Sequence, residues 1–164
     1  FAPVLRRSLQ TARILAAEEA AATATKHEEL MLTLAVPDKP LIVSQAVKRV
    51  TVPGEEGYFG VSKNQPPTLA QLKPGVVTVE PVEGENEKFF IPGGFAFVHA
   101  NNVLDISSPI GVHLDDIDVD ELKSQYAAAT AARDAAESGS KEEAKAIVSV
   151  ETFKSMAHAL NVTL

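Results

Sequence analysis

The chain has no cysteine among its 164 residues, and this absence excludes a disulfide framework and a thiolate metal site. Basic residues are also scarce, since 15 lysines and arginines face 22 acids and give a formal net charge of -7. Nucleic-acid surfaces need clustered lysine and arginine, so this charge argues against one. No apolar run approaches the roughly 18–20 residues of a membrane-spanning helix. We therefore expect any membrane association to be indirect.

The sequence also lacks the motifs of common active sites. It contains no GxxxxGKS/T phosphate loop, no GxGxxG fingerprint and no GxSxG nucleophile elbow. The acidic run at 115–121 does not fit a calcium loop, because Glu121 and Ala127 replace the required glycine and bidentate glutamate. The histidines do not have the spacing of a zinc site: His27, His99, His113 and His158. The sequence thus predicts no catalytic, metal or cofactor site.

Glycine and proline divide the chain into three segments. The composition, 45% apolar and 23% charged, is typical of a globular protein. Nine of the ten prolines lie between Pro37 and Pro109, and eight of the nine glycines lie between Gly54 and Gly111. Both residues punctuate short strands and interrupt long helices. We therefore predict an N-terminal helical extension at 1–28, a β-sandwich domain at 29–114 and an α-helical hairpin domain at 115–164.

The N-terminal segment predicts one amphipathic helix at residues 4–25. Its narrow apolar stripe has helical spacing and consists of Leu5, Leu9, Ala12 and Ala16. Residues 1–17 carry three arginines and no acid, which is typical of an organelle-targeting segment. A basic helix of the mature protein is an equal alternative. Because the first residue is Phe1 rather than methionine, we expect a processed product.

The middle segment predicts eight to ten short strands. Apolar residues alternate with other residues in its first run, and turn signals follow at close intervals, as in a sandwich or barrel. We expect hairpin turns at 83–86, with Gly84 and Asn86 at positive φ, and at 101–102. The clearest runs are Leu30–Val36, Leu41–Ser44, Val47–Val52, Gly75–Val82, Glu87–Ile91, Phe95–His99 and Val103–Ser107.

Four phenylalanines on two neighbouring strands form a candidate aromatic site. Phe89, Phe90, Phe95 and Phe97 could line a ligand pocket or stack nucleic-acid bases. The acidic charge argues against bases, and Phe95 and Phe97 share one face of their strand. We therefore predict that the group packs in the core.

The C-terminal segment predicts two antiparallel helices. Capping boxes are expected at Asp118 with Glu121 and at Ser140 with Glu143. Gly139 stands between the helices, where a left-handed residue lets the chain reverse. Apolar residues recur at helical spacing from 119 to 129 and from 147 to 160, and those of the second helix could also contact something outside the chain. Phe153 and Leu160 are candidates for such contacts.

Three motifs in fixed order carry a resemblance to a known family. They are VPGEEGYFGV at 52–61, PPTLAQLKPGVVTV at 66–79 and FFIPGGFAFV at 89–98. This order resembles the delta subunits of mitochondrial F-type ATP synthases, the counterparts of bacterial and chloroplast epsilon subunits. The resemblance implies an α+β fold, in which a β-sandwich of about ten strands precedes an antiparallel α-helical hairpin. The predicted N-terminal helix would be an addition to that fold.

The same resemblance implies a non-catalytic subunit of the central stalk, or rotor. Such a subunit couples the gamma subunit to the membrane c-ring during proton-driven ATP synthesis, and its hairpin holds the small mitochondrial epsilon subunit. It lies on the matrix side of the mitochondrial inner membrane, where only the c-ring gives it membrane contact. We expect the N-terminal helix to dock on a neighbouring subunit.

By position, the resemblance assigns two contact regions. Glu55, Glu56 and Tyr58 are expected to face the loops of the c-ring. Gln65, Pro66 and Pro67, with the adjoining strand edges, are expected to face gamma. Ser62 and Gln65 stand where the family commonly has leucine and histidine, so the contact at this loop is expected to differ in detail.

Two other hypotheses remain open. In the first, the chain is a regulator that senses nucleotide or inhibits ATP hydrolysis through its hairpin. Some bacterial relatives bind ATP through an Ile/Leu-Asp-x-x-Arg-Ala motif, whereas Lys123 and Ser124 stand at its last two positions here. Lysine lacks the planar fork of arginine, which argues against ATP sensing. In the second, the chain is a β-sandwich adaptor unrelated to the synthase.

Overall fold

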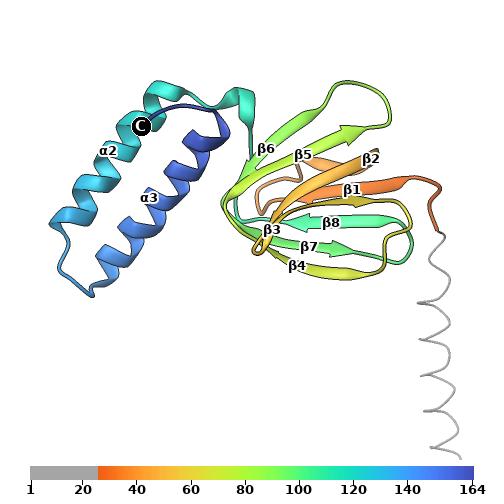
Figure 1. Cartoon of the computed structure of the whole chain (residues 1–164), viewed down its shortest axis with the longest axis horizontal. Helices are drawn as coiled ribbons and strands as arrows, with labels where there is room; N and C mark the ends of the chain where they lie inside the picture. The colour runs from red at the N-terminus through yellow and green to blue at the C-terminus, as the bar shows by residue number, and fades with distance from the viewer. Residues whose placement is uncertain (1–25) are drawn as a thin grey trace, which may run out of the picture.

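The computed structural model describes residues 26–164, which form a β-sandwich followed by a hairpin of two helices (Figure 1). The hairpin projects from one end of the sandwich (Figure 1). This arrangement confirms the predicted sandwich and hairpin. The helix expected at 4–25 lies outside the described residues. No described helix is long and apolar enough to cross a membrane.

The described elements comprise nine strands, one 3-10 turn and two α-helices. In chain order they are β1 (Leu30–Ala35), β2 (Ile42–Gly54), β3 (Gly57–Ser62), β4 (Thr68–Leu72), β5 (Gly75–Pro81), β6 (Glu87–Ile91), β7 (Gly94–Val98), β8 (Val103–Ser107), β9 (Val112–His113), η1 (Leu114–Asp116), α2 (Val119–Ala135) and α3 (Lys141–Ala159). The strands follow the order β1-β8-β7-β4-β2-β5-β6-β9, with β3 on β2 and an additional pairing of β1 with β2.

Strand β2 belongs to both layers of the sandwich. Its first half pairs with β1, and its second half pairs with β3 and β5. The sequence predicted two separate strands here, which was wrong. Ser44 adopts a φ of 46°, and the β1–β2 register shifts between Leu32 and Leu34. This irregularity occurs within one continuous strand of 13 residues, because β-bulges interrupt a ladder without ending the strand.

The core fills the space between the two layers. β1 shows the expected alternation, since Leu30, Leu32 and Leu34 are at most 1% exposed and the residues between them are half-buried. Val50 on β2 and Val77 on β5 complete the opposing layer with no exposed surface. Side chains at this depth pack at the density of organic crystals, which makes the sandwich stiff.

The aromatic prediction is right for one strand and wrong for the other. Phe89 and Phe90 on β6 are buried, at 5% and 2% exposure. Phe95 and Phe97 on β7 are 48% and 39% exposed, so they do not belong to the core. Period-two alternation puts both on one face, as expected, but Ala96 points inward and the phenylalanines point outward.

The turns confirm most of the predicted backbone conformations. Gly84 has a φ of 108°, Gly139 a φ of 81° and Asn102 a φ of 61°. Asn86, by contrast, is not among the residues with positive φ. A glycine suffices for this turn because it enters the left-handed region without a steric penalty.

The helices begin at the predicted caps, with one difference in detail. The Asp118 carboxylate accepts hydrogen bonds from the backbone N–H groups of Asp120 and Glu121, at 2.8 and 3.3 Å. Ser140 Oγ accepts from Glu143 N–H at 3.1 Å. The Glu143 carboxylate reaches back to Gly139 N–H, at 2.6 Å, instead of to Ser140 as a standard capping box would require.

Candidate interfaces

Three large exposed apolar side chains of the sandwich lie on the adjoining strands β4 and β7. Leu69 on β4 lies directly opposite Phe97 on β7, and Gln71 lies opposite Phe95. Leu69 is 65% exposed, and the two phenylalanine rings lie 6.5 Å apart in a tilted arrangement. We call these three residues, Leu69, Phe95 and Phe97, the outer apolar face. Exposed aliphatic and aromatic side chains in contact with one another are typical of protein interfaces.

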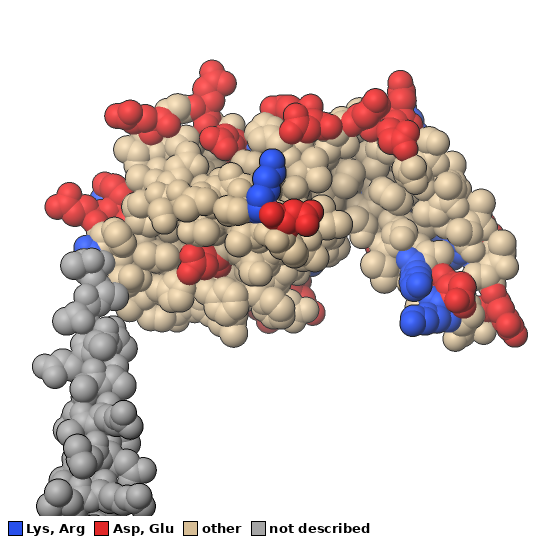
Figure 2. All heavy atoms as spheres, turned by 180° about the vertical axis from the view of Figure 1, so that it is seen from behind, with Lys and Arg blue, Asp and Glu red and all other residues tan. Residues whose placement is uncertain are grey.

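Polar groups border the outer apolar face on β8. Asp105 lies opposite Phe97, and its Oδ2 is 3.0 Å from His99 Nε2. Both side chains are close to half exposed. Seen from behind, the sandwich has a broad area with few charged side chains, and acids gather along its upper rim (Figure 2). An apolar centre with a polar border is the usual composition of a protein interface.

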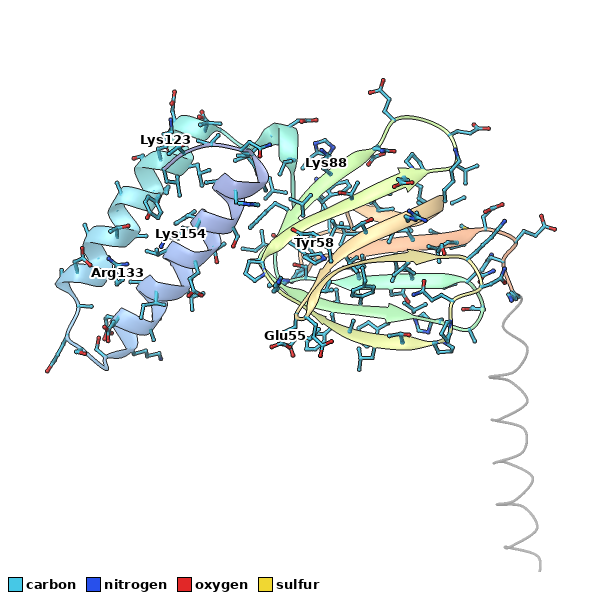
Figure 3. All side chains as sticks on the ribbon, viewed as in Figure 1. Glu55, Tyr58, Lys88, Lys123, Arg133 and Lys154 are labelled. Atoms are coloured by element: carbon cyan, nitrogen blue, oxygen red, sulfur yellow. The ribbon has the colours of Figure 1, made fainter. Side chains whose placement is uncertain are left out.

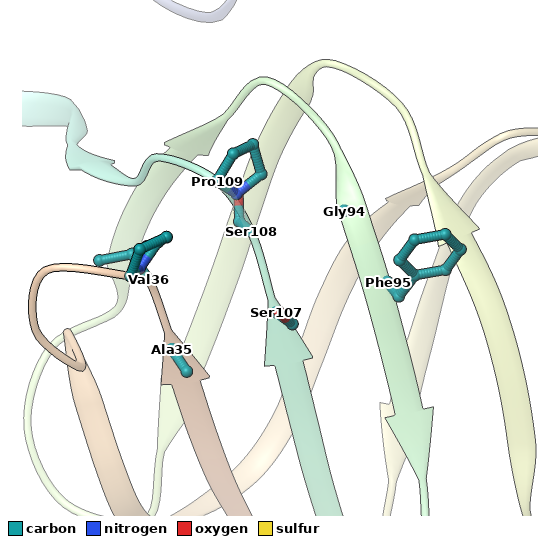
Figure 4. A pocket seen from close by; sticks show the side chains of 8 residues that line it. Ala35, Val36, Gly94, Phe95, Ser107, Ser108 and Pro109 are labelled. Atoms are coloured by element: carbon teal, nitrogen blue, oxygen red, sulfur yellow. The ribbon is translucent and has the colours of Figure 1, made fainter.

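A cavity of about 430 Å³ adjoins Phe95 at one end of this layer (Figure 4). Gly94 and Ser107 both line it, and a Cβ on Gly94 would collide with the carbonyl group of Ser107, so the two strands can approach this closely only with glycine at position 94. The cavity is lined by Ala35, Val36, Pro37, Gly94, Phe95, Ser107, Ser108 and Pro109.

The residues predicted to face the c-ring lie together at one tip of the sandwich. Glu55 and Glu56 form the turn between β2 and β3, and Tyr58 follows at 59% exposure (Figure 3). The turn is held by a hydrogen bond from Glu55 N–H to the Gln71 carbonyl at 3.2 Å. The Tyr58 hydroxyl accepts from Val76 N–H at 3.4 Å. The tip therefore presents two carboxylates and one aromatic ring on an anchored backbone.

The predicted gamma-facing loop connects β3 to β4. Gln65 Oε1 accepts a hydrogen bond from Ser62 N–H at 3.1 Å, and Pro66 and Pro67 are exposed. Asn64, with a φ of 63°, donates its N–H to buried Asn102 at 2.8 Å. The loop is thus fixed in place, and it leads directly into the β4 strand that carries Leu69.

The hairpin candidates are less exposed than their neighbours. Phe153 and Leu160 are only half-buried on α3, whereas Val148 is 63% exposed and Ile147 is 40% exposed. The sequence analysis did not single out Val148, because helical spacing alone does not show which side of a helix faces solvent. On α2, a groove of about 540 Å³ is lined by Lys123, Tyr126, Ala127, Thr130, Ala131, Asp134 and Leu164. A hydrogen bond to Asp134 raises the pKa of Arg133 at the end of this groove.

Side chains that could bind a metal ion are scattered in the described part of the chain. Residues 26–164 contain no group of three histidines, cysteines or acids that could hold a metal ion. His113 acts locally instead, since its Nδ1 accepts from Asp115 N–H at 3.4 Å at the start of η1.

Comparison with known proteins decides the family. Residues 29–107 match the family model of the ATP synthase delta/epsilon chain, beta-sandwich domain. The chain is 38% identical over 148 residues to the mitochondrial ATP synthase F(1) complex subunit delta of Dictyostelium discoideum, covering 90% of this chain and 84% of that protein. The chain belongs to the ATP synthase delta/epsilon family. This membership excludes a β-sandwich unrelated to the synthase.

Two further comparisons agree. Mitochondrial ATP synthase subunit delta of Saccharomyces cerevisiae is 34% identical over 141 residues, which cover 85% of this chain and 86% of that one. A chain in the Euglena gracilis mitochondrial ATP synthase structure, containing OSCP, F1 and the c-ring, superposes with a TM-score of 0.73 at 28% identity. That match covers 84% of this chain and 85% of the Euglena chain.

The family settles several predictions made from the sequence. The chain is a non-catalytic subunit of a mitochondrial F-type ATP synthase. As predicted, it is located at the matrix side of the mitochondrial inner membrane as a peripheral part of the complex. What the surfaces described above contact is a separate question.

Proposed function

We propose that the chain is the adaptor that joins the gamma subunit of the stalk to the membrane c-ring. In this role the outer apolar face binds gamma, and the tip formed by Glu55, Glu56 and Tyr58 contacts the ring loops. Proton flow turns the ring, and the adaptor passes the torque to the shaft. The single observation that supports the proposal best is the exposure of Leu69, Phe95 and Phe97 on adjoining strands.

Exposed side chains of this size are costly to leave in water. Burial of one large apolar side chain contributes roughly 1.5–3 kcal/mol. Aromatic residues at the centre of an interface are the usual hot spots, where truncation costs about 2 kcal/mol or more. Phe95 and Phe97 fit this description because they stand side by side, with the polar His99–Asp105 pair at their border.

The carboxylates of the tip suit a contact with the ring loops that fixes the orientation of the chain on the ring. The carboxylates of Glu55 and Glu56 extend from an anchored turn, so they can meet donors on polar loops of the ring in a fixed register. Exposed charges contribute little affinity. We therefore assign the strength of docking to the outer apolar face and the orientation on the ring to the tip.

The hairpin fits the small mitochondrial epsilon subunit as partner. The groove of about 540 Å³ lies along α2, where Ala127 and Ala131 are among the residues that line it. Exposed Val148 on α3 adds apolar surface. A groove along one helix, lined by small, aromatic and charged side chains, can accept an amphipathic segment.

The test is to follow the chain in its source cells. A tagged chain is extracted from membranes with mild detergent and separated on a native gel stained for ATP hydrolysis. We expect it to migrate with the large ATPase band. A variant in which Leu69, Phe95 and Phe97 are all serine should migrate as a small free species. A control variant in which two other exposed apolar residues, Val43 and Ile110, are both serine should remain with the ATPase band. Migration of the unaltered chain only as a free species would overturn the proposal.

A further inference from the structure

Strand β3 is an edge strand, and its register shows which backbone groups face outward. Within the described residues, β3 pairs with β2 alone. Tyr58 lies opposite Pro53, which has no N–H and whose carbonyl accepts from Lys73 N–H at 3.0 Å on the other side of β2. Tyr58 and Pro53 therefore form a non-hydrogen-bonded pair. Since the pattern alternates, the N–H and C=O groups of Tyr58, Gly60 and Ser62 point away from β2.

One of these three residues already has a local partner. Ser62 N–H donates to Gln65 Oε1 at 3.1 Å. Tyr58 and Gly60 remain as the outward-facing positions. Gly60 is exposed, and because it has no side chain its exposure is that of the backbone itself. A Cβ placed on Gly60 would meet only the Arg49 side chain, at 3.5 Å or more. The backbone edge is thus open to an approaching strand.

The two edges of the described sheet differ in how they are protected. Strand β9, at the opposite edge, has only two residues. Strand β3 has six, and its sequence GYFGVS contains no charge and no proline. Proteins usually protect an edge by shortness, charge, proline or a bulge. The β3 edge has none of these, which makes it a template for strand addition.

We propose that β3 accepts one extended segment of the stalk partner that covers the outer apolar face, through backbone hydrogen bonds at Tyr58 and Gly60. The inference rests on the proposed function. Continuity supports this occupant, because Phe59 of β3 and Leu69 of β4 line the same cavity of about 320 Å³, which Glu55 and Glu56 of the tip also line. A partner that covers Leu69 therefore reaches the β3 edge across that cavity.

The side chains of β3 specify the kind of segment. On the inner side, Phe59 is partly buried and packs against the core, so the added strand should place an apolar residue there. On the outer side, Gly60 leaves space between Tyr58 and Ser62 for a large side chain. An extended segment with alternating apolar residues fits both sides. Backbone bonds would also hold it in one register along β3.

Amide hydrogen exchange tests the proposal at single residues. The full-length chain is measured alone and within the intact synthase, with Phe59 and Val61 as references because their N–H groups face β2. We expect the Tyr58 and Gly60 amides to exchange freely in the isolated chain and roughly 100-fold more slowly in the synthase. Fast exchange at both residues within an assembled synthase would overturn the inference and leave the proposed function intact. Absence of the chain from the synthase would instead refute the proposed function.

Protection in the isolated chain would also contradict the inference. If that protection rose with concentration, the occupant would be a second copy of the chain. If it did not, the occupant would be another segment of the same chain.

A pair of variants at Gly60 provides an independent test. Gly60→Pro removes the outward N–H, whereas Gly60→Ala keeps it and serves as the control. We expect the proline variant to dissociate from the synthase about 10-fold faster than the alanine variant, with both chains equally folded. Equal retention of two folded variants would count against strand addition. If the proline variant unfolds, the exchange measurement alone decides.

Discussion

The sandwich and the hairpin differ in how deeply they bury their apolar side chains. In the sandwich, 17 hydrophobic residues from both layers form one buried cluster. In α2 and α3, the buried residues are Leu122, Ala146, Val150 and Ala157, and two of these are alanines. Small side chains remove little apolar area from water, so the contact between α2 and α3 stabilises the hairpin only weakly. From this difference we expect the sandwich to unfold at higher denaturant than the hairpin, and the hairpin to gain more stability from an external partner.

The largest effect is expected where the sandwich core is broken. Leu32 on β1 has no exposed surface, so Leu32→Ala should lower the free energy of unfolding by about 3 kcal/mol through lost burial and a cavity. Urea unfolding of the isolated chain measures this. Leu69→Ala is the control, because Leu69 is 65% exposed and should change stability by less than about 0.5 kcal/mol. Similar losses in the two variants would contradict the assignment of inner and outer faces.

The reverse pattern is expected for assembly. Phe97→Ala should weaken binding to the stalk by about 2 kcal/mol, because it removes an aromatic residue from the centre of the outer apolar face. The isolated chain should keep its stability nearly unchanged. Competition between the variant and the unaltered chain for synthase depleted of this subunit gives the ratio of affinities. Leu32→Ala, measured below its unfolding transition, should bind normally, and a binding defect equal to that of Phe97→Ala would argue against the face.

A smaller effect is expected at the start of α3. Ser140→Ala removes the Oγ that accepts from Glu143 N–H, at a cost of about 1 kcal/mol. Because few large side chains are buried between α2 and α3, this loss should reduce the helical circular dichroism signal at a lower denaturant concentration than the one that unfolds the sandwich. Ser138→Ala, two residues earlier and outside the cap, is the matched control. A single transition shifted equally for helices and strands would show that the two regions unfold together.

No effect is expected from nucleotide. Lys123 replaces the arginine of the ATP-binding motif and cannot form its bidentate contact. Calorimetry of the isolated chain with ATP should therefore give no binding heat, and Asp120→Ala should leave this baseline unchanged. Binding at micromolar ATP that Asp120→Ala abolishes would support the regulatory alternative.

The sequence predicted the order of the elements because its signals were local. Each signal depends on residues close together in the chain. Examples are the alternation in β1, the glycine at 139 and the capping residue at the start of each helix. The β2 strand was harder, since Ser44 at positive φ marks an irregularity that the sequence makes look like a turn. Strand β3 was missed because Gly57 and Gly60 have low strand propensity, and pairing with β2 overrides it.

The candidate interfaces depended on information that the sequence does not contain. Alternation showed that Phe95 and Phe97 share a face, but the burial of Ala96 decides which face that is. Leu69 joins them only through the β4–β7 register, which pairs it with Phe97, 28 residues later in the chain. The turn at Glu55 and the loop at Gln65 were found by resemblance. Their contacts remain predictions.

The most direct measurement compares ATP synthesis with ATP hydrolysis in membranes of cells whose only copy of this chain is the triple-serine variant of Leu69, Phe95 and Phe97. If the chain joins shaft to ring through this face, proton-driven synthesis should be lost while hydrolysis by the catalytic part continues without pumping protons. Normal proton-driven synthesis with the altered face, in membranes that contain no unaltered chain, would contradict the account.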